Sequence, residues 1–390
     1  MKHTTLATRM DTIQPFHVMG ILARARQLES SGKHILHMEI GEPDFATPAP
    51  IMAAGMQALR DNHTKYTPAC GLPALRERIA GWYAERFGLN IAPERVIVTP
   101  GASGALQLAL GVLVNPADEV LLTDPGYPCN RNFVRLFGGT PIGLPVTAAH
   151  NYQPSLADIQ AAWTAQTRLA LLASPANPTG TLLAEADIRA FHPYIQQQGG
   201  TLIIDEIYQG LTYGQEASTA LSVADDIWIV NSFSKYFGMT GWRLGWLIAP
   251  EYALDAINRL AQNIFLAPST PAQYAALAAF SAETIDITEA RRMEFARRRD
   301  FLLPALRELG FSIPSSPNGA FYIYAGAERF GDDAQRLSME MLEQAGVAFT
   351  PGIDFGDNQP QTHVRFAYTT GMAELEQAVE RLGRFLPKPS

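Results

Sequence analysis

Alternating apolar and polar segments predict a succession of strands and helices up to about residue 249. Short apolar runs rich in β-branched residues, which are typical of buried strands, lie at residues 95–99, 119–123, 168–173, 201–204 and 227–231. An amphipathic helix is predicted at residues 71–87, before the first of these strands, because Leu72, Ile79 and Trp82 share one helical face. Strands that alternate with helices predict an α/β fold with a mostly parallel sheet and right-handed crossovers.

The pattern changes after residue 271. Residues 283–309 read as one long helix, and strands at 321–324 and 363–368 follow with helices between and after them. At the other end of the chain, a helix is predicted at 18–29 and a strand at 35–40. The pattern of the C-terminal part therefore predicts that it folds as a smaller α+β unit.

The length of 390 residues predicts two domains, because a single core rarely grows to this size. We predict a large domain over residues 46–282 and a small C-terminal domain over residues 283–390. Residues 1–45 are predicted to form an N-terminal arm and part of the small domain.

Composition and charge exclude several classes of protein. A net charge of −8 argues against nucleic acid or an anionic membrane as the main partner. Cys70 and Cys129 are too few for a disulfide framework and lack the spacing of metal ligands, so we expect no metal site and a reducing compartment. No secretory signal and no run of eighteen apolar residues is visible. We expect a soluble, cytoplasmic protein.

Two of the predicted strands end in groups suited to holding a cofactor. The strands at 201–204 and 227–231 lead into Asp205, Tyr208, Ser232, Ser234, Lys235 and Arg243. Ligands of open α/β sheets gather outside the carboxyl ends of the strands, so these groups face one crevice. An acid, a phenol, hydroxyls, an amine and a guanidinium suit a flat, anionic, nitrogen-containing cofactor that a lysine holds covalently. Taken alone, Lys235 is better explained as a solvated loop residue, so the case for a catalytic lysine depends on the rest of the chain.

A second strand end predicts a place for an anion. The strand at 95–99 runs into residues 100–104, a turn with two glycines, and then into an apolar helix. Free amides and the positive end of the helix dipole favour a phosphate there, although the pattern is neither a P-loop nor GxGxxG. Proline-rich loops after other strands present Tyr127 and Asn177 to the same crevice, and Asn177 also has a structural explanation as a turn residue.

Six segments in the same order resemble the pyridoxal-phosphate-dependent aminotransferases of fold type I, class I/II (aspartate aminotransferase-like). They are GEPDF at 41–45, KYTP at 65–68, SPANPTG at 174–180, DEIY at 205–208, SFSKYFGMTGWRLGW at 232–246 and VRFAY at 364–368. The resemblance implies a large domain with a mostly parallel seven-stranded sheet flanked by helices, and a smaller α+β domain. It also implies pyridoxal 5′-phosphate as cofactor and a homodimer with shared active sites.

The resemblance implies catalytic roles for Lys235, Asp205 and Tyr208. Lys235 would form the Schiff base with the cofactor and carry the proton at the substrate α-carbon. Asp205 would keep the pyridine nitrogen protonated, and Tyr208 with Asn177 would bind the phenolic oxygen of the ring. Tyr127 would stack on the ring face.

The remaining roles are also implied by the resemblance. The phosphate would be held by Ala102, Ser103, Ser232, Ser234 and Arg243, and by Tyr66 of the neighbouring subunit. Arg365, Gly41 and Asn177 would bind the substrate, with Arg365 on its α-carboxylate.

The implied reaction is the ping-pong transfer of an amino group between an L-amino acid and a 2-oxo acid in amino-acid metabolism and biosynthesis. Glutamate with 2-oxoglutarate is expected as one pair; the other amino acid is of aspartate, alanine, aromatic or branched-chain type. Aspartate-specific relatives of one subgroup carry a lysine where this chain has Ser103. Phe16 and Val18 either line an apolar side-chain pocket or belong to the core.

Two alternatives are a pyridoxal-phosphate C–S β-lyase of the same fold and a non-catalytic effector-binding module. The module is disfavoured because Lys235 and Asp205 are both present and no residues are spare for a DNA-binding domain. We therefore expect small-molecule partners, with neither nucleic acid nor membrane.

Overall fold

The computed structural model describes residues 6–386, and a seven-stranded sheet forms its centre. From one edge to the other, its strands are β2 (Val96–Thr99), β8 (Gly245–Ile248), β7 (Trp228–Ser232), β6 (Thr201–Asp205), β5 (Thr167–Ala173), β3 (Glu119–Asp124) and β4 (Thr140–Pro145). β8 runs antiparallel to both neighbours, and the other strands are parallel to one another. The α/β class and the mostly parallel sheet are confirmed.

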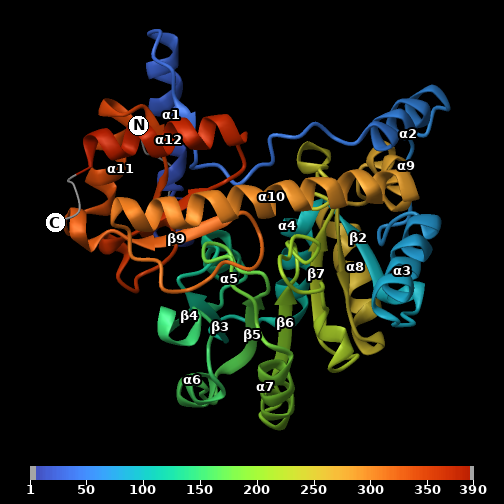
Figure 1. Ribbon diagram of the computed structural model, residues 1–390. Helices are drawn as coiled ribbons and strands as arrows, with labels where there is room; N and C mark the ends of the chain where they lie inside the picture. Colours follow the sequence, from blue (N-terminus) through green and yellow to red (C-terminus); the bar gives the residue numbers. More distant parts are fainter. Residues whose placement is uncertain (1–5, 387–390) are drawn as a thin grey trace, which may run out of the picture.

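Helices cover both faces of this sheet (Figure 1). One face packs against α4 (Gly101–Leu113), α5 (Pro128–Leu136) and α8 (Leu254–Ile264). The other packs against α3 (Pro73–Phe87), α6 (Leu156–Ala162), α7 (Glu185–Gln197) and α9 (Thr270–Leu277), with α2 (Ala49–Arg60) beside α9. In β6, Leu202 and Ile204 face the helices α3, α6, α7 and α9, whereas Ile203 faces α4, α5 and α8. Burial on both sides explains why the strands read as continuous apolar runs.

Two small sheets lie beside one end of the long helix α10 (Ala282–Leu309), which crosses the upper end of the large sheet in Figure 1. One is antiparallel, in the order β11 (Thr350–Pro351), β12 (His363–Ala367) and β9 (Tyr322–Gly326); the other pairs β1 (Leu36–His37) with β10 (Val347–Ala348) in parallel. The helices around them are α1 (His17–Ser30), α11 (Ala334–Gln344) and α12 (Met372–Phe385). The β1–β10 pairing thus joins the start of the chain to its C-terminal part.

Two boundaries differ from those predicted, and two strands of the large sheet, β4 and β8, were not predicted individually. β1 is shorter than the predicted strand at 35–40, because Glu39 and Ile40 leave the sheet and reach the pocket described below. The helix after β2 begins at Gly101, so Ala102 and Ser103 lie in its first turn and not in the preceding loop. β4 was not predicted because prolines and a glycine interrupt its sequence TPIGLP; such residues are tolerated at a sheet edge.

Within residues 6–386, no helix is long and apolar enough to cross a membrane.

Candidate active site

A pocket of about 320 Å³ lies at the carboxyl ends of β5, β6 and β7, between the large sheet and the small sheets. It brings together most of the predicted site residues: Gly41, Ala102, Ser103, Tyr127, Asn177, Asp205, Tyr208, Ser234, Lys235, Arg243 and Arg365. Phe16 and Val18 line it as well. Of the two alternatives given for these residues, the lining of a pocket is therefore correct and a place in the core is not. Segments far apart in the sequence therefore meet at one place.

Two predicted residues do not line this pocket. Ser232 is buried just behind it and donates a hydrogen bond from its Oγ to Ser234 Oγ, 2.9 Å away. Tyr66 is 82% exposed and lies outside the pocket of its own chain. Ser232 therefore contacts the pocket only through Ser234, and Tyr66 does not contribute to the pocket of its own chain.

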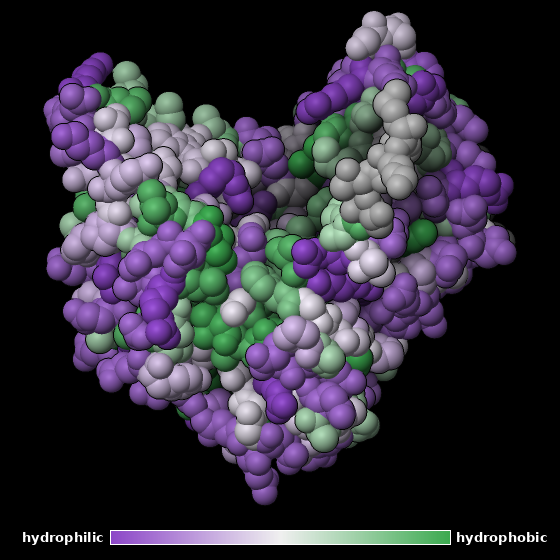
Figure 2. Space-filling model, turned by 180° about the vertical axis from the view of Figure 1, so that it is seen from behind, coloured by the Kyte–Doolittle hydropathy of each residue, from purple (hydrophilic) through white to green (hydrophobic). Residues whose placement is uncertain are grey.

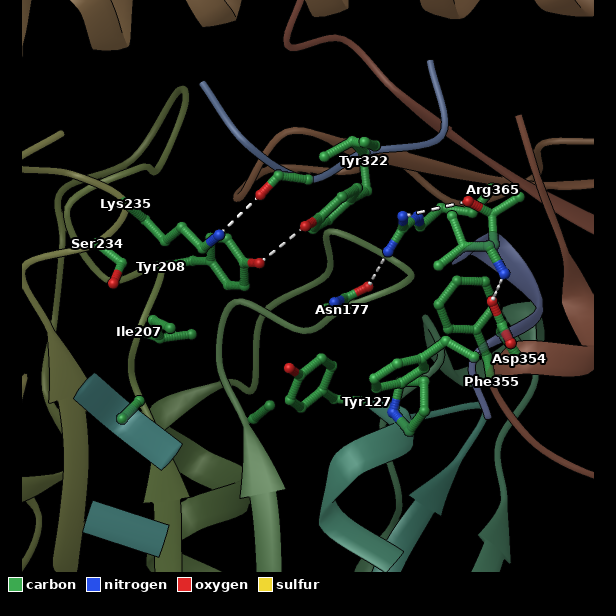
Figure 3. Close-up of a pocket in the computed structure, with 18 of the residues that line it drawn as sticks. Tyr127, Asn177, Ile207, Tyr208, Ser234, Lys235, Tyr322, Asp354, Phe355 and Arg365 are labelled. Carbon is green, nitrogen blue, oxygen red and sulfur yellow. Dashed lines mark hydrogen bonds between the residues drawn. The ribbon is translucent and has the colours of Figure 1, made fainter. Parts of the chain in front are cut away.

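Lys235 follows β7 and reaches into the pocket, where its Nζ donates to the carbonyl oxygen of Gly41 at 2.7 Å (Figure 3). Burial lowers the pKa of its amine to about 8. Nearby, the hydroxyls of Tyr208 and Tyr322 lie 2.9 Å apart. Only a glycine fits at position 41, because a Cβ there would lie 1.8 Å from the Tyr322 hydroxyl. Burial thus makes the neutral amine of Lys235 easier to form than that of an exposed lysine.

Asp205 ends β6 at the base of the pocket and is 5% exposed. Its carboxylate accepts a hydrogen bond from the Ile207 amide at 3.0 Å, and burial raises its pKa to about 6. Among residues 6–386, no lysine, arginine or histidine forms an ion pair with it. A buried acid of this kind suits a ligand that brings its own positive charge.

The first turn of α4 is suited to bind an anion. Its N-cap residue, Pro100, supplies no side-chain hydrogen bond, so the amides of the first turn stay available at the positive end of the helix dipole. The Arg243 guanidinium lies so close that a Cβ on Gly101 would be 2.5 Å from its Nη2. Together with the Ser234 hydroxyl, these donors match a phosphate.

Arg365 stands on β12, at the opposite side of the pocket from Lys235 (Figure 3). Its Nη1 donates to Asn177 Oδ1 at 2.9 Å and its Nη2 to the Glu39 carbonyl at 2.6 Å. The guanidinium lies over the rings of Tyr322 and Phe355, 4.3 and 4.9 Å from their centroids. Its Nε is buried without a hydrogen-bond partner. An immobilised guanidinium with an unused donor is suited to bind a carboxylate.

The chain matches the family described as aminotransferase class I and II over residues 33–382. It is 34% identical over 377 residues to a valine–pyruvate aminotransferase of Mycobacterium tuberculosis, covering 96% of this chain and 97% of that protein. It is 33% identical over 393 residues to an aspartate aminotransferase of Geobacillus stearothermophilus, with 98% of each covered. A crystal structure of an aminotransferase from Mycobacterium tuberculosis superposes with a TM-score of 0.95 at 33% identity, covering 99% of this chain and all of the other. This chain belongs to the class I/II aminotransferases.

The cofactor of this aminotransferase is pyridoxal phosphate, and the residues of the pocket fit it. The buried carboxylate of Asp205 lacks the cationic partner that a protonated pyridine nitrogen would provide. The open amides of α4, with Ser234 and Arg243, match its phosphate, and the amine of Lys235 matches its aldehyde.

Sequence reasoning missed the pocket residues Glu39, Tyr322, Thr350, Asp354 and Phe355 of this aminotransferase. No local motif distinguishes them. They reach the pocket because β9, β11 and β12 pair with one another and because Glu39 follows β1. A prediction of which strands pair would have been needed to find them.

Labelling of the cofactor-free aminotransferase with an amine-acylating reagent is expected to show Lys235 half-reactive near pH 8. The reason is that burial favours the neutral amine, whose ordinary pKa is 10.5. Mass spectrometry of the labelled peptide across pH 6–11 checks this. The same lysine in urea-unfolded protein is the control and should need a higher pH. Equal profiles in the folded and unfolded protein would contradict the prediction.

Asp354→Ala is expected to lower the free energy of unfolding by about 1–3 kcal/mol. The N-cap residue of α1, Phe16, has no side-chain oxygen to accept hydrogen bonds from the first-turn amides. The carboxylate of Asp354, which is distant in the sequence, accepts them instead, from the amides of His17 at 2.6 Å and Val18 at 2.8 Å. Urea unfolding curves measure the loss, and Asp354→Asn, which keeps one acceptor, should lose less. No difference between Asp354→Ala and the unmodified chain would contradict this anchoring role.

Proposed function

We propose that this aminotransferase transfers the amino group of an L-amino acid to a 2-oxo acid by a ping-pong mechanism, with the cofactor attached to Lys235. The observation that supports this most strongly is the placement of three groups around one pocket. They are a lysine of lowered pKa, a buried carboxylate without a cation, and a guanidinium with a free donor. Each complements a different part of the cofactor and its amino-acid substrate.

The residues of the pocket have distinct proposed roles toward the cofactor. Pyridoxal phosphate supplies an electron sink for the bond that breaks at the substrate α-carbon. Asp205 keeps the ring nitrogen protonated, while Tyr208 and Asn177 donate hydrogen bonds to the phenolic oxygen. Tyr127 packs against the ring face. The phosphate is bound by the amides of Ala102 and Ser103 and by Ser234 and Arg243, with Ser232 orienting Ser234.

Lys235 is proposed to move the proton at the substrate α-carbon. An amine with a pKa of about 8 has a far larger neutral fraction near physiological pH than an ordinary lysine, whose pKa is 10.5, so its Nζ can take a proton and return it. Its hydrogen bond to the Gly41 carbonyl holds it in the pocket when it is not reacting. A fully charged surface lysine would lack this ability.

Arg365 is proposed to bind the α-carboxylate, with the backbone at Gly41 beside it and Asn177 between substrate and cofactor. Arg365 belongs to the proposed small domain, residues 283–390, and Lys235 to the proposed large domain, residues 46–282. A substrate held by both would draw the domains together and exclude water.

The proposed assembly is a homodimer in which Tyr66 reaches the phosphate of the partner chain. Tyr66 is exposed, as are the apolar side chains of Met52, Met56 and Leu59 on α2. Figure 2 shows apolar side chains gathered around the hollow between two projecting lobes, a surface that suits burial against another protein. Sedimentation should give twice the 42.6 kDa of one chain. A fully active single chain would contradict the shared site.

The amino-acid pair remains a prediction. Relatives of this chain are named for valine and pyruvate and for aspartate, so membership of the family leaves the pair open. Glutamate with 2-oxoglutarate is the pair expected from the sequence, with an aspartate-, alanine- or aromatic-type amino acid on the other side. The cytoplasmic location likewise remains a prediction.

The test is a single half-reaction. The purified enzyme, loaded with pyridoxal phosphate, is mixed with one amino acid and no oxo acid while its visible absorbance is followed. Transamination predicts that a substrate amino acid removes the yellow band and that an oxo acid restores it. If no amino acid changes the band, or if pyruvate and ammonia accumulate from cystathionine instead, the proposal is wrong and a C–S β-lyase becomes the better account.

A further inference from the structure

The pocket has an apolar side that the proposed chemistry does not use. It is formed by Phe16, Val18, Met19, Leu22 and Phe355, which we call the apolar wall. Figure 3 places Phe355 beside Arg365 and away from Lys235. A substrate held by its α-carboxylate at Arg365 therefore has this wall close by, within reach of its side chain.

The helix α1 is built to present this wall. One of its faces packs into a small core formed by Ile21, Ala25, Leu28, Ile35, Leu342 and Ala348. Val18, Met19 and Leu22 lie toward the pocket, and Met19 is still 55% exposed there. The two hydrogen bonds from α1 to Asp354 hold its first turn in place. The wall thus offers fixed apolar surface that a ligand can cover.

The charges that one chain contributes to the pocket argue against a second carboxylate on the substrate. The cations that line it are Lys235, Arg243 and Arg365, and each already has a role in the proposed function. In the part of the chain that the structure describes, no other lysine, arginine or histidine lines it. The acid nearest to the wall is Asp354, between α1 and Phe355, and its charge would repel an anionic side chain.

We infer that the amino donor carries a neutral, extended apolar side chain, of the leucine, methionine or phenylalanine kind, which packs against the apolar wall. This inference rests on the proposed function and narrows its substrate class. Each buried methylene group should improve binding roughly fourfold. A side-chain carboxylate would be desolvated there without a partner. For the same reason, a monocarboxylic oxo acid fits this pocket better than 2-oxoglutarate, so this inference departs from the glutamate and 2-oxoglutarate pair expected from the sequence.

The half-reaction of the holoenzyme separates the possibilities. The apparent second-order rate of absorbance loss is measured for leucine, methionine, phenylalanine, aspartate and glutamate. The inference predicts that the rate with the best apolar donor exceeds the rates with aspartate and glutamate by roughly tenfold or more. Equal or faster reaction of aspartate or glutamate would overturn it while leaving transamination intact. If no amino acid reacted, the proposed function itself would fail.

A charge added to the wall gives a second test. Met19→Arg should raise the rate with aspartate relative to leucine by roughly tenfold, because it supplies the missing cation. Met293→Arg is the matched control: it changes a methionine that is 65% exposed on α10 and does not line the pocket. In this control, the ratio of the rates with aspartate and leucine should equal that of the unmodified enzyme. An unchanged ratio in a folded Met19→Arg variant would contradict the position of the substrate side chain.

Discussion

Lys235→Ala is expected to reduce multiple-turnover transamination by roughly 10³-fold or more. The substitution removes both the group proposed to hold the cofactor and the base proposed to move the α-proton. No other lysine lines the pocket among residues 6–386, so none can take over either role. The measurement is kcat with a saturating amino acid and oxo acid, together with the visible absorbance of the bound cofactor.

Lys33→Ala is the control for this experiment. Lys33 is exposed and donates to the Glu343 carbonyl at 3.2 Å, far from the pocket residues. This variant should keep both its activity and its absorbance band. If Lys235→Ala retained full turnover, the mechanism proposed for the pocket would be wrong.

Arg365→Ala is expected to lower kcat/KM for amino acids by roughly 10²-fold or more, mainly through KM. The guanidinium is buried, oriented by Asn177 and Glu39, and stacked between two rings, so no neighbouring group can replace it. Removing it leaves the α-carboxylate without a bidentate donor. Arg365→Lys keeps the charge but loses the planar pair of donors. Its kcat/KM should therefore lie between that of the unmodified enzyme and that of Arg365→Ala.

The readout that separates binding of the carboxylate from general damage is a pair of substrates. A primary amine with the same side chain but no carboxylate should react with the Arg365→Ala variant as slowly as with the unmodified enzyme. In the Arg365→Ala variant, the amino acid should react only slightly faster than that amine, whereas in the unmodified enzyme it should react much faster. An unchanged KM for the amino acid would contradict the proposed role of Arg365.

The parts of the site that were predictable are those that follow strands directly. Asp205 ends one buried strand and Lys235 follows the end of another, and the sheet brings such ends together whatever the rest of the chain does. The apolar runs identified these strands because both faces of the sheet are covered. β4 was missed since its prolines and glycine hide the apolar pattern.

The parts that were not predictable depend on contacts between distant segments. Tyr322 meets Tyr208 across 114 positions of sequence, and Asp354 meets His17 across 337. Nothing in the residues around Asp354 indicates that it caps a helix that lacks its own N-cap. Similarly, Ser232 belongs to the expected motif, but it does not line the pocket, because it is the buried last residue of β7, whereas Ser234 lies beyond the strand and reaches the pocket.

The most direct test of the central claim is to find the lysine that carries the cofactor. The chain has five lysines, namely Lys2, Lys33, Lys65, Lys235 and Lys388. Reduction of the holoenzyme with borohydride fixes a lysine-bound cofactor permanently, and digestion followed by mass spectrometry then locates it. We predict the added mass on the peptide that contains Lys235 and on no other. The same mass on a different lysine, or no modified lysine in a protein that transaminates, would contradict the account.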